Sequence, residues 1–105
     1  MQMNSADIAN EMTSLDGWSL DQDLPCIHKA WVFDSFPTAM AFFAAVGGLA
    51  ESADHHPECL SSFTHFRIRL WTHDAKGLTM KDFELARRID ELVEQDYSNR
   101  VQCNP

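Results

Sequence analysis

The sequence predicts an α+β fold: a single domain over residues 1–105, in the order α-β-β-α-β-β-α, with a four-stranded antiparallel sheet and three helices packed on one face. Three segments place apolar residues at helical spacing, and four short segments between them have the composition of strands. These strand segments come in two pairs with short links, which favours antiparallel pairing. With 105 residues, 45% of them hydrophobic, the chain can form one small core.

The first predicted element is a short helix from about Ser5 to Leu15. Asn4 or Ser5 can cap it, and Ile8, Met12 and Leu15 form a narrow apolar stripe. Gly17 ends the helix. Residues 18–20 are predicted to form a first strand, and residues 21–25 have the composition of a turn.

The second predicted strand runs from Cys26 to Phe33. A period of two places Ile27, Trp31 and Phe33 on one face, which Lys29 interrupts. The central helix then begins at the N-cap Ser35 and runs to about Ala53. Its expected apolar face is broad and consists of Phe36, Met40, Phe43, Ala50 and Ala53, widened by Ala39, Val46 and Leu49.

Gly47 and Gly48 lie inside this helix, where each glycine costs roughly 1 kcal/mol relative to alanine. Two explanations stay open: close approach by another backbone, such as a partner helix, or a local kink.

The second half of the chain predicts a strand pair and a final helix. Residues 59–64 form the third predicted strand and residues 66–72 the fourth. In the fourth, Phe66, Ile68, Leu70 and Thr72 face one way, and Arg67, Arg69, Trp71 and His73 face the other. Thr79 and Asp82 have the spacing of a capping box. The expected core stripe of the final helix is Phe83, Leu85, Ala86, Ile89, Leu92 and Val93, and the tail after Tyr97 is expected to fray.

Charge and cysteine usage restrict the classes of function. The net charge of −8 disfavours binding to phosphate backbones, so we expect no nucleic-acid partner. Cys26, Cys59 and Cys103 are far apart and form no C-x-x-C, which indicates a reducing compartment. The N-terminus shows no basic and apolar leader pattern, and the stretch 31–50 is interrupted by polar residues and a proline. We therefore expect a cytoplasmic protein without a membrane partner.

Three of the five histidines belong to two motifs that precede Asp82: Glu51-Ser-Ala-Asp54-His55-His56-Pro57 and Thr72-His73. Histidine is the side chain whose unperturbed pKa lies nearest to neutral pH, and a carboxylate partner commonly orients it. The pattern predicts proton-transfer chemistry.

Each of these residues also has a purely structural explanation. Glu51 and His55 are spaced i, i+4, so they can form an ordinary ion pair at the helix end, and at most one of His55 and His56 can share Glu51. Asp82 serves a capping box whatever its role in a site, and we expect both roles. By strand parity His73 lies on the open face of the sheet or at its rim, where a merely solvated histidine is the alternative.

A metal site is the main chemical alternative for clustered histidines. His55, His56 and His73 could supply three zinc ligands. Adjacent histidines rarely chelate one ion, however, and no H-x-x-x-H or C-x-x-C is present. We therefore expect no metal.

The combination Glu51-x-x-x-His55-His56-Pro57-Glu58, followed by Thr72-His73-x-x-x-Gly77-Leu78-Thr79-x-x-Asp82, resembles the pterin-4a-carbinolamine dehydratase family. Gly17-Trp18 and Phe33-x-x-Phe36 also match, so the resemblance covers about residues 17–94. It implies the same sheet and helices, a homodimer or homotetramer built through sheet edges and the central helix, and a small-molecule pterin substrate. No metal and no bound cofactor are implied.

The resemblance implies dehydration of 4a-hydroxytetrahydropterin to quinonoid dihydropterin, which regenerates the pterin of the aromatic amino acid hydroxylases. In the roles that it implies, His55 and His73 are the general acid and base, and His56 binds or orients the pterin. Glu51 and Asp82 orient and polarise the histidines. The implied substrate-binding residues are Asp54, His55, His56, Trp71, Thr72 and His73.

The chain departs from the common pattern of this family at three places. Cys59 stands where the family commonly has tryptophan, residues 61–64 replace Asn-Val-Tyr-Asn, and Trp71 replaces a small residue. Trp71 could narrow the pterin pocket or stack on the ring. Two alternatives therefore stay open: an interaction protein, since some members bind a homeodomain transcription factor, and a dehydratase-like domain for another pterin or for molybdopterin metabolism.

Overall fold

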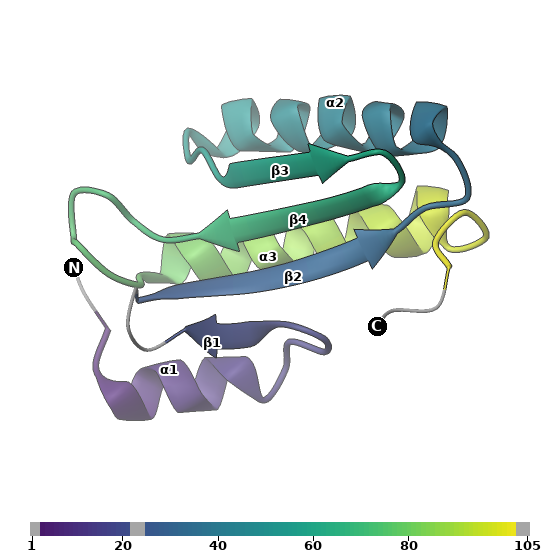
Figure 1. The fold of residues 1–105 in the computed structure, drawn as a ribbon. Helices are drawn as coiled ribbons and strands as arrows, with labels where there is room; N and C mark the ends of the chain where they lie inside the picture. Colours follow the sequence, from purple (N-terminus) through teal and green to yellow (C-terminus); the bar gives the residue numbers. More distant parts are fainter. Residues whose placement is uncertain (1–2, 22–24, 103–105) are drawn as a thin grey trace.

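The computed structural model describes residues 3–21 and 25–102. Four strands form one antiparallel sheet of order β1-β2-β4-β3: β1 (Ser19–Asp21), β2 (Cys26–Val32), β3 (Glu58–Ser62) and β4 (His65–Leu70). The helices are α1 (Ser5–Met12), α2 (Phe36–Ala53) and α3 (Met80–Leu92), and a π-helical turn, η1 (Val93–Tyr97), extends α3. In Figure 1, α3 lies behind β4 and β2, α2 runs along the β3 side of the sheet, and α1 lies beside β1. The predicted fold class and element order are confirmed.

The core lies between the sheet and the helices that cover it. The strands contribute Ile27, Trp31, Phe66 and Ile68, all at most 1% exposed, from the alternating positions that the sequence predicts. Lys29 interrupts this face, and it is accommodated at the core's margin because its Nζ lies 3.0 Å from Oδ1 of Asp90 on α3.

The buried face of α2 differs from the predicted one. Phe42, which is not part of the predicted stripe, is fully buried together with Ala39 and Val46, whereas Phe36 and Phe43 are 46% and 39% exposed. The ring of Phe42 packs against those of Trp31, Phe33, Phe66 and Tyr97. The prediction was wrong because α2 is apolar on nearly every side, so its pattern does not single out a face.

The two glycines of α2 are not explained by packing within the chain. Apart from the chain neighbours and the backbone of α2 itself, a Cβ built on Gly47 or Gly48 would meet no atom of the described residues within 4 Å. The helix continues through both positions.

Contrary to the sequence expectation, α2 is also long and apolar enough to qualify as a membrane span by length and mean hydropathy, a test that core helices pass too. The buried face of α2 packs on the sheet.

The tail after Tyr97 was expected to fray, and for residues 98–102 that expectation is wrong. Val101 forms a bridge with Phe33, the Asp34 amide donates to the Arg100 carbonyl (2.8 Å), and the Gln102 amide donates to the Val32 carbonyl (2.6 Å). The π-helical turn brings this segment back to the end of β2, where it finds backbone partners that sequence periodicity does not reveal. Cys103 lies outside the described residues.

Candidate functional site

The candidate site lies where the end of α2, the end of β4 and the start of α3 meet. Asp54 caps α2 in the left-handed conformation (φ 51°, ψ 44°), in which non-glycine residues are uncommon. The chain turns sharply there, as Pro57 predicts, and the turn separates the two neighbouring histidines. His55 points inward and is 8% exposed, whereas His56 is exposed.

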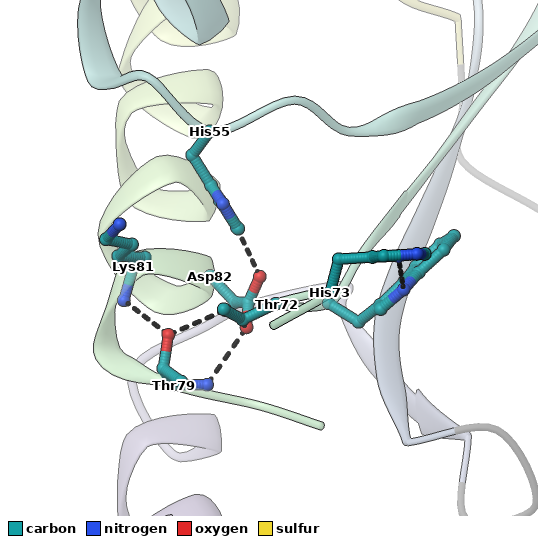
Figure 2. Close-up of polar contacts among 7 residues, drawn as sticks. His55, Thr72, His73, Thr79, Lys81 and Asp82 are labelled. Carbon is teal, nitrogen blue, oxygen red and sulfur yellow. Dashed lines mark hydrogen bonds and ion pairs between the residues drawn. The ribbon is translucent and has the colours of Figure 1, made fainter. Parts of the chain in front are cut away.

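His55 is bound to a fully buried carboxylate. Its Nε2 lies 2.6 Å from Oδ1 of Asp82, and Asp82 is 0% exposed. The other carboxylate oxygen, Oδ2, accepts hydrogen bonds from the Thr72 hydroxyl (2.9 Å) and the Thr79 backbone amide (3.0 Å). Figure 2 shows the His55 ring directed at Asp82, with Thr72 and Thr79 on the other side of the carboxylate. Asp82 completes the capping box of α3, as predicted, and the same carboxylate holds His55.

The predicted pairing of Glu51 with His55 is wrong. Oε1 of Glu51 lies 2.8 Å from Nε2 of His56 instead, and both side chains are largely exposed. The i, i+4 argument assumed a helix that continues to His55, but the left-handed turn at Asp54 directs His55 into the protein and leaves His56 beside Glu51.

The contact with Asp82 determines which atom of His55 is free to react. With Nε2–H donating to Asp82, the lone pair of the neutral ring lies on Nδ1. His55 also lines a pocket that is described below, so Nδ1 is the ring nitrogen left for a ligand there.

His73 lies just beyond the end of β4 and is exposed. In Figure 2 it lies on the far side of Thr72 from His55. Nε1 of Trp71 is 3.4 Å from Nδ1 of His73, and the Arg69 guanidinium lies 5.7 Å from the centroid of the Trp71 ring. The Thr72 amide donates to the Gly77 carbonyl (2.9 Å), which closes the loop that follows.

A pocket of about 390 Å³ unites most of the predicted residues, and we call it the acid/base pocket. Its lining consists of Asp54, His55, His56, Trp71, Thr72, His73, Asp74 and Lys81. Glu51 does not line the pocket but contacts its residue His56, and Asp82 likewise contacts His55 and Thr72. Asp74 and Lys81 were missed because exposed charged residues in a loop or a first helical turn look like ordinary solvated positions in a sequence. The sole signal was their place inside the Thr72–Asp82 motif.

Among the residues that the structure describes, the acid/base pocket is lined by no cysteine. Cys26 and Cys59 are free cysteines, and burial raises the pKa of Cys59 to about 11, so it is not an activated nucleophile. Within residues 3–21 and 25–102, no group of three or more His, Cys, Asp or Glu side chains is arranged to hold a metal ion.

Comparison with known proteins gives a consistent result. Residues 1–92 match the family model described as pterin 4 alpha carbinolamine dehydratase. Proteins provisionally named pterin-4-alpha-carbinolamine dehydratase include one from Sinorhizobium medicae, 39% identical over 89% of each chain. Another, from Roseiflexus castenholzii, is 42% identical over 87% of this chain and 96% of its own.

Two solved structures are similar in fold. A Brucella melitensis protein described as a transcriptional coactivator/pterin dehydratase superposes with a TM-score of 0.84 at 28% identity, over 88% of this chain and 98% of that one. A pterin dehydratase-like protein described as a RuBisCO assembly factor in the alpha-carboxysome gives a TM-score of 0.63 at 25% identity, over 72% of this chain and 88% of that one. On the family model and these relatives together, the chain belongs to the pterin-4-alpha-carbinolamine dehydratase family.

Proposed function

We propose that this chain removes water from a 4a-hydroxytetrahydropterin to give a quinonoid dihydropterin, by general acid/base catalysis with His55 and His73. The observation that supports this most directly is the buried His55–Asp82 pair, whose free imidazole nitrogen is open beside the other two histidines. Family membership supports the substrate class.

The reaction needs one proton delivered and one removed. The hydroxyl at C4a leaves as water once an acid protonates it, and loss of a ring N–H proton to a base forms the new C=N bond. Two imidazoles can supply both steps, and each such group typically contributes about 10²–10⁴-fold. Because Asp82 holds Nε2 of His55, Nδ1 is the atom of His55 that exchanges a proton with the substrate.

The remaining residues position the pterin. His56, held by Glu51, and the exposed side of Thr72 and Asp54 line the same pocket. His55 and His73 line the same pocket, so the ring system would sit against both imidazoles. In this role the enzyme would return the pterin to an aromatic amino acid hydroxylase in the cytoplasm, without a metal or a bound cofactor.

The decisive assay follows loss of the 4a-hydroxytetrahydropterin absorbance, with the substrate generated in situ. Wild-type protein should accelerate the decay, and His55→Gln and His73→Ala should each lower kcat by roughly 10²-fold or more. His65→Ala is the matched control, because His65 is an exposed histidine on β4 that does not line the acid/base pocket. Full activity in both site variants would refute the acid/base assignment.

A protein-interaction function is the second candidate, and the edge of the sheet favours it. β3 is an edge strand, and Leu60 and Phe63 on that strand and its hairpin are 63% and 71% exposed. Exposed apolar side chains beside an open strand edge are typical of interfaces. We propose that this edge and α2 form a homo-oligomer. If so, Leu60→Lys should lower the molecular mass of the protein as measured by sedimentation. A separate function in binding another protein should survive His73→Ala.

A further inference from the structure

A second pocket adjoins the acid/base pocket and has no role in the proposed proton transfers. It has a volume of about 520 Å³, and Trp71 and His73 line both pockets, so the two are neighbours. We call it the side pocket. Its other lining residues include Pro25, Cys26, Glu58 and Arg69.

The walls of the side pocket favour a flat, apolar group, and Lys76 is the one Lys, Arg, Asp or Glu of its lining outside the Glu58–Arg69 pair. Trp71, Pro25 and Cys26 form apolar walls. Glu58 and Arg69 are paired, with Oε1 2.9 Å from Nη1, so their charges largely cancel. An aromatic ring bound there would be removed from water and would pack on the Trp71 ring, either stacked on its face or against its edge.

Trp71 is already held in place by its neighbours. The Arg69 guanidinium lies 5.7 Å from the centroid of its ring, Glu58 anchors Arg69 from the adjacent strand, and the indole Nε1 contacts His73. A wall that is ordered before binding loses little side-chain entropy when a ring stacks on it. Such preorganisation is expected of a binding surface.

The sizes of the two pockets point the same way. The acid/base pocket alone falls within the usual range for ligand sites, about 300–1,000 Å³, and so can hold a bicyclic pterin. A methyl group or a short hydroxylated chain at C6 would leave the larger side pocket almost empty. We propose that the side pocket binds the 6-substituent of the pterin, that this substituent contains an aromatic ring, and that Trp71 is the specificity-determining residue. This inference rests on the proposed dehydratase function.

Equilibrium binding tests the inference without turnover. The probes are two stable oxidised pterins, 6-methylpterin and 6-(anilinomethyl)pterin, and the measurement is Kd by isothermal titration calorimetry. Wild type should bind the anilinomethyl compound at least about tenfold more tightly, which corresponds to about 1.4 kcal/mol. Trp71→Leu should abolish the preference, and Trp71→Phe should retain most of it.

Two further variants separate the side pocket from general effects. Pro25→Ser removes an apolar wall of the side pocket only, and should weaken the anilinomethyl compound by about threefold. Leu20→Ser removes an exposed apolar side chain on β1 that lines neither pocket, and should leave both affinities unchanged.

Equal affinity of wild type for the two pterins would overturn the inference, and so would a preference that persists in Trp71→Leu. The dehydratase assay distinguishes failure of the side-pocket assignment from failure of the proposed dehydratase function. Equal affinities with dehydration intact refute the side-pocket assignment alone, whereas binding of neither pterin and no acceleration refute the proposed function and the side pocket together.

Discussion

Nε2 of His55 and Oδ1 of Asp82 lie 2.6 Å apart, although the two residues are 27 positions apart in the chain. His55 follows the end of α2 and Asp82 belongs to the first turn of α3, so the contact ties together two helices that cover the same sheet. The carboxylate is fully buried and accepts three hydrogen bonds at once. A histidine held in this way has a defined orientation and a defined tautomer.

The first prediction concerns Asp82 as the residue that positions His55. Asp82→Asn should lower kcat by about 10²-fold with a much smaller change in KM, because the amide cannot hold the same tautomer of the ring. Asp90→Asn is the matched control: Asp90 is also on α3 and also binds two side chains, Trp18 and Lys29, but lies outside the acid/base pocket. It should lower the unfolding free energy and leave kcat unchanged. Equal kcat losses in both variants would show that the effect is only structural.

The second prediction concerns the exposed pair of Glu51 and His56. Glu51→Gln should change the free energy of unfolding by no more than about 0.5 kcal/mol, because the side chains are 80% and 63% exposed and water screens their interaction. If His56 orients the pterin, KM should rise while kcat stays nearly constant. Urea unfolding and steady-state kinetics measure the two effects. A loss of several kcal/mol would mean that the pair is buried by an interface.

The third prediction separates two neighbouring phenylalanines on α2. Phe42→Ala should destabilise the protein by about 3–5 kcal/mol, because Phe42 is fully buried among four aromatic rings. Phe43→Ala should cost only about 1 kcal/mol, since Phe43 is 39% exposed and keeps one edge-to-face contact with Phe66. Chemical denaturation of the two variants checks this. Equal losses would contradict the observed face of α2, or would show that Phe43 is buried between subunits.

The fourth prediction concerns alkaline pH and Cys59. Burial raises the pKa of this thiol to about 11 from an ordinary value of 9.0. The unfolded chain therefore loses the proton before the folded one does, so the stability that this thiol contributes is present below pH 9 and is lost as pH rises through 11. Between pH 9 and pH 11, the Tm of wild type should therefore fall relative to the Tm of Cys59→Ala.

Alkylation gives an independent measurement of the same group. Peptide-resolved reaction of Cys59 with iodoacetamide should increase with a midpoint near pH 11 in the folded protein and near pH 9 in urea. A midpoint near 9 in the folded protein would show that strand β3 opens readily to solvent.

Much of the fold followed from local patterns in the sequence. The alternation of Phe66, Ile68 and Leu70 predicted β4 and its buried face, and the capping signals of Ser35 and Thr79 located the starts of α2 and α3. These features depend on residues a few positions apart, and short-range sterics and hydrogen bonding determine them. The histidine and carboxylate motifs likewise sufficed to predict the family, which the comparisons confirm.

Tertiary structure alone decided how these parts combine. Because of the left-handed turn at Asp54, His55 contacts Asp82 and His56 contacts Glu51. Packing in the aromatic cluster buries Phe42 of α2 and leaves Phe43 partly exposed. The returning tail at Val101 and the side pocket beside Trp71 also arise only when distant segments meet. The physical reason is common to all of them. Periodicity constrains residues three or four positions apart, whereas a buried carboxylate, a packed ring or a pocket depends on which surfaces the whole chain brings together.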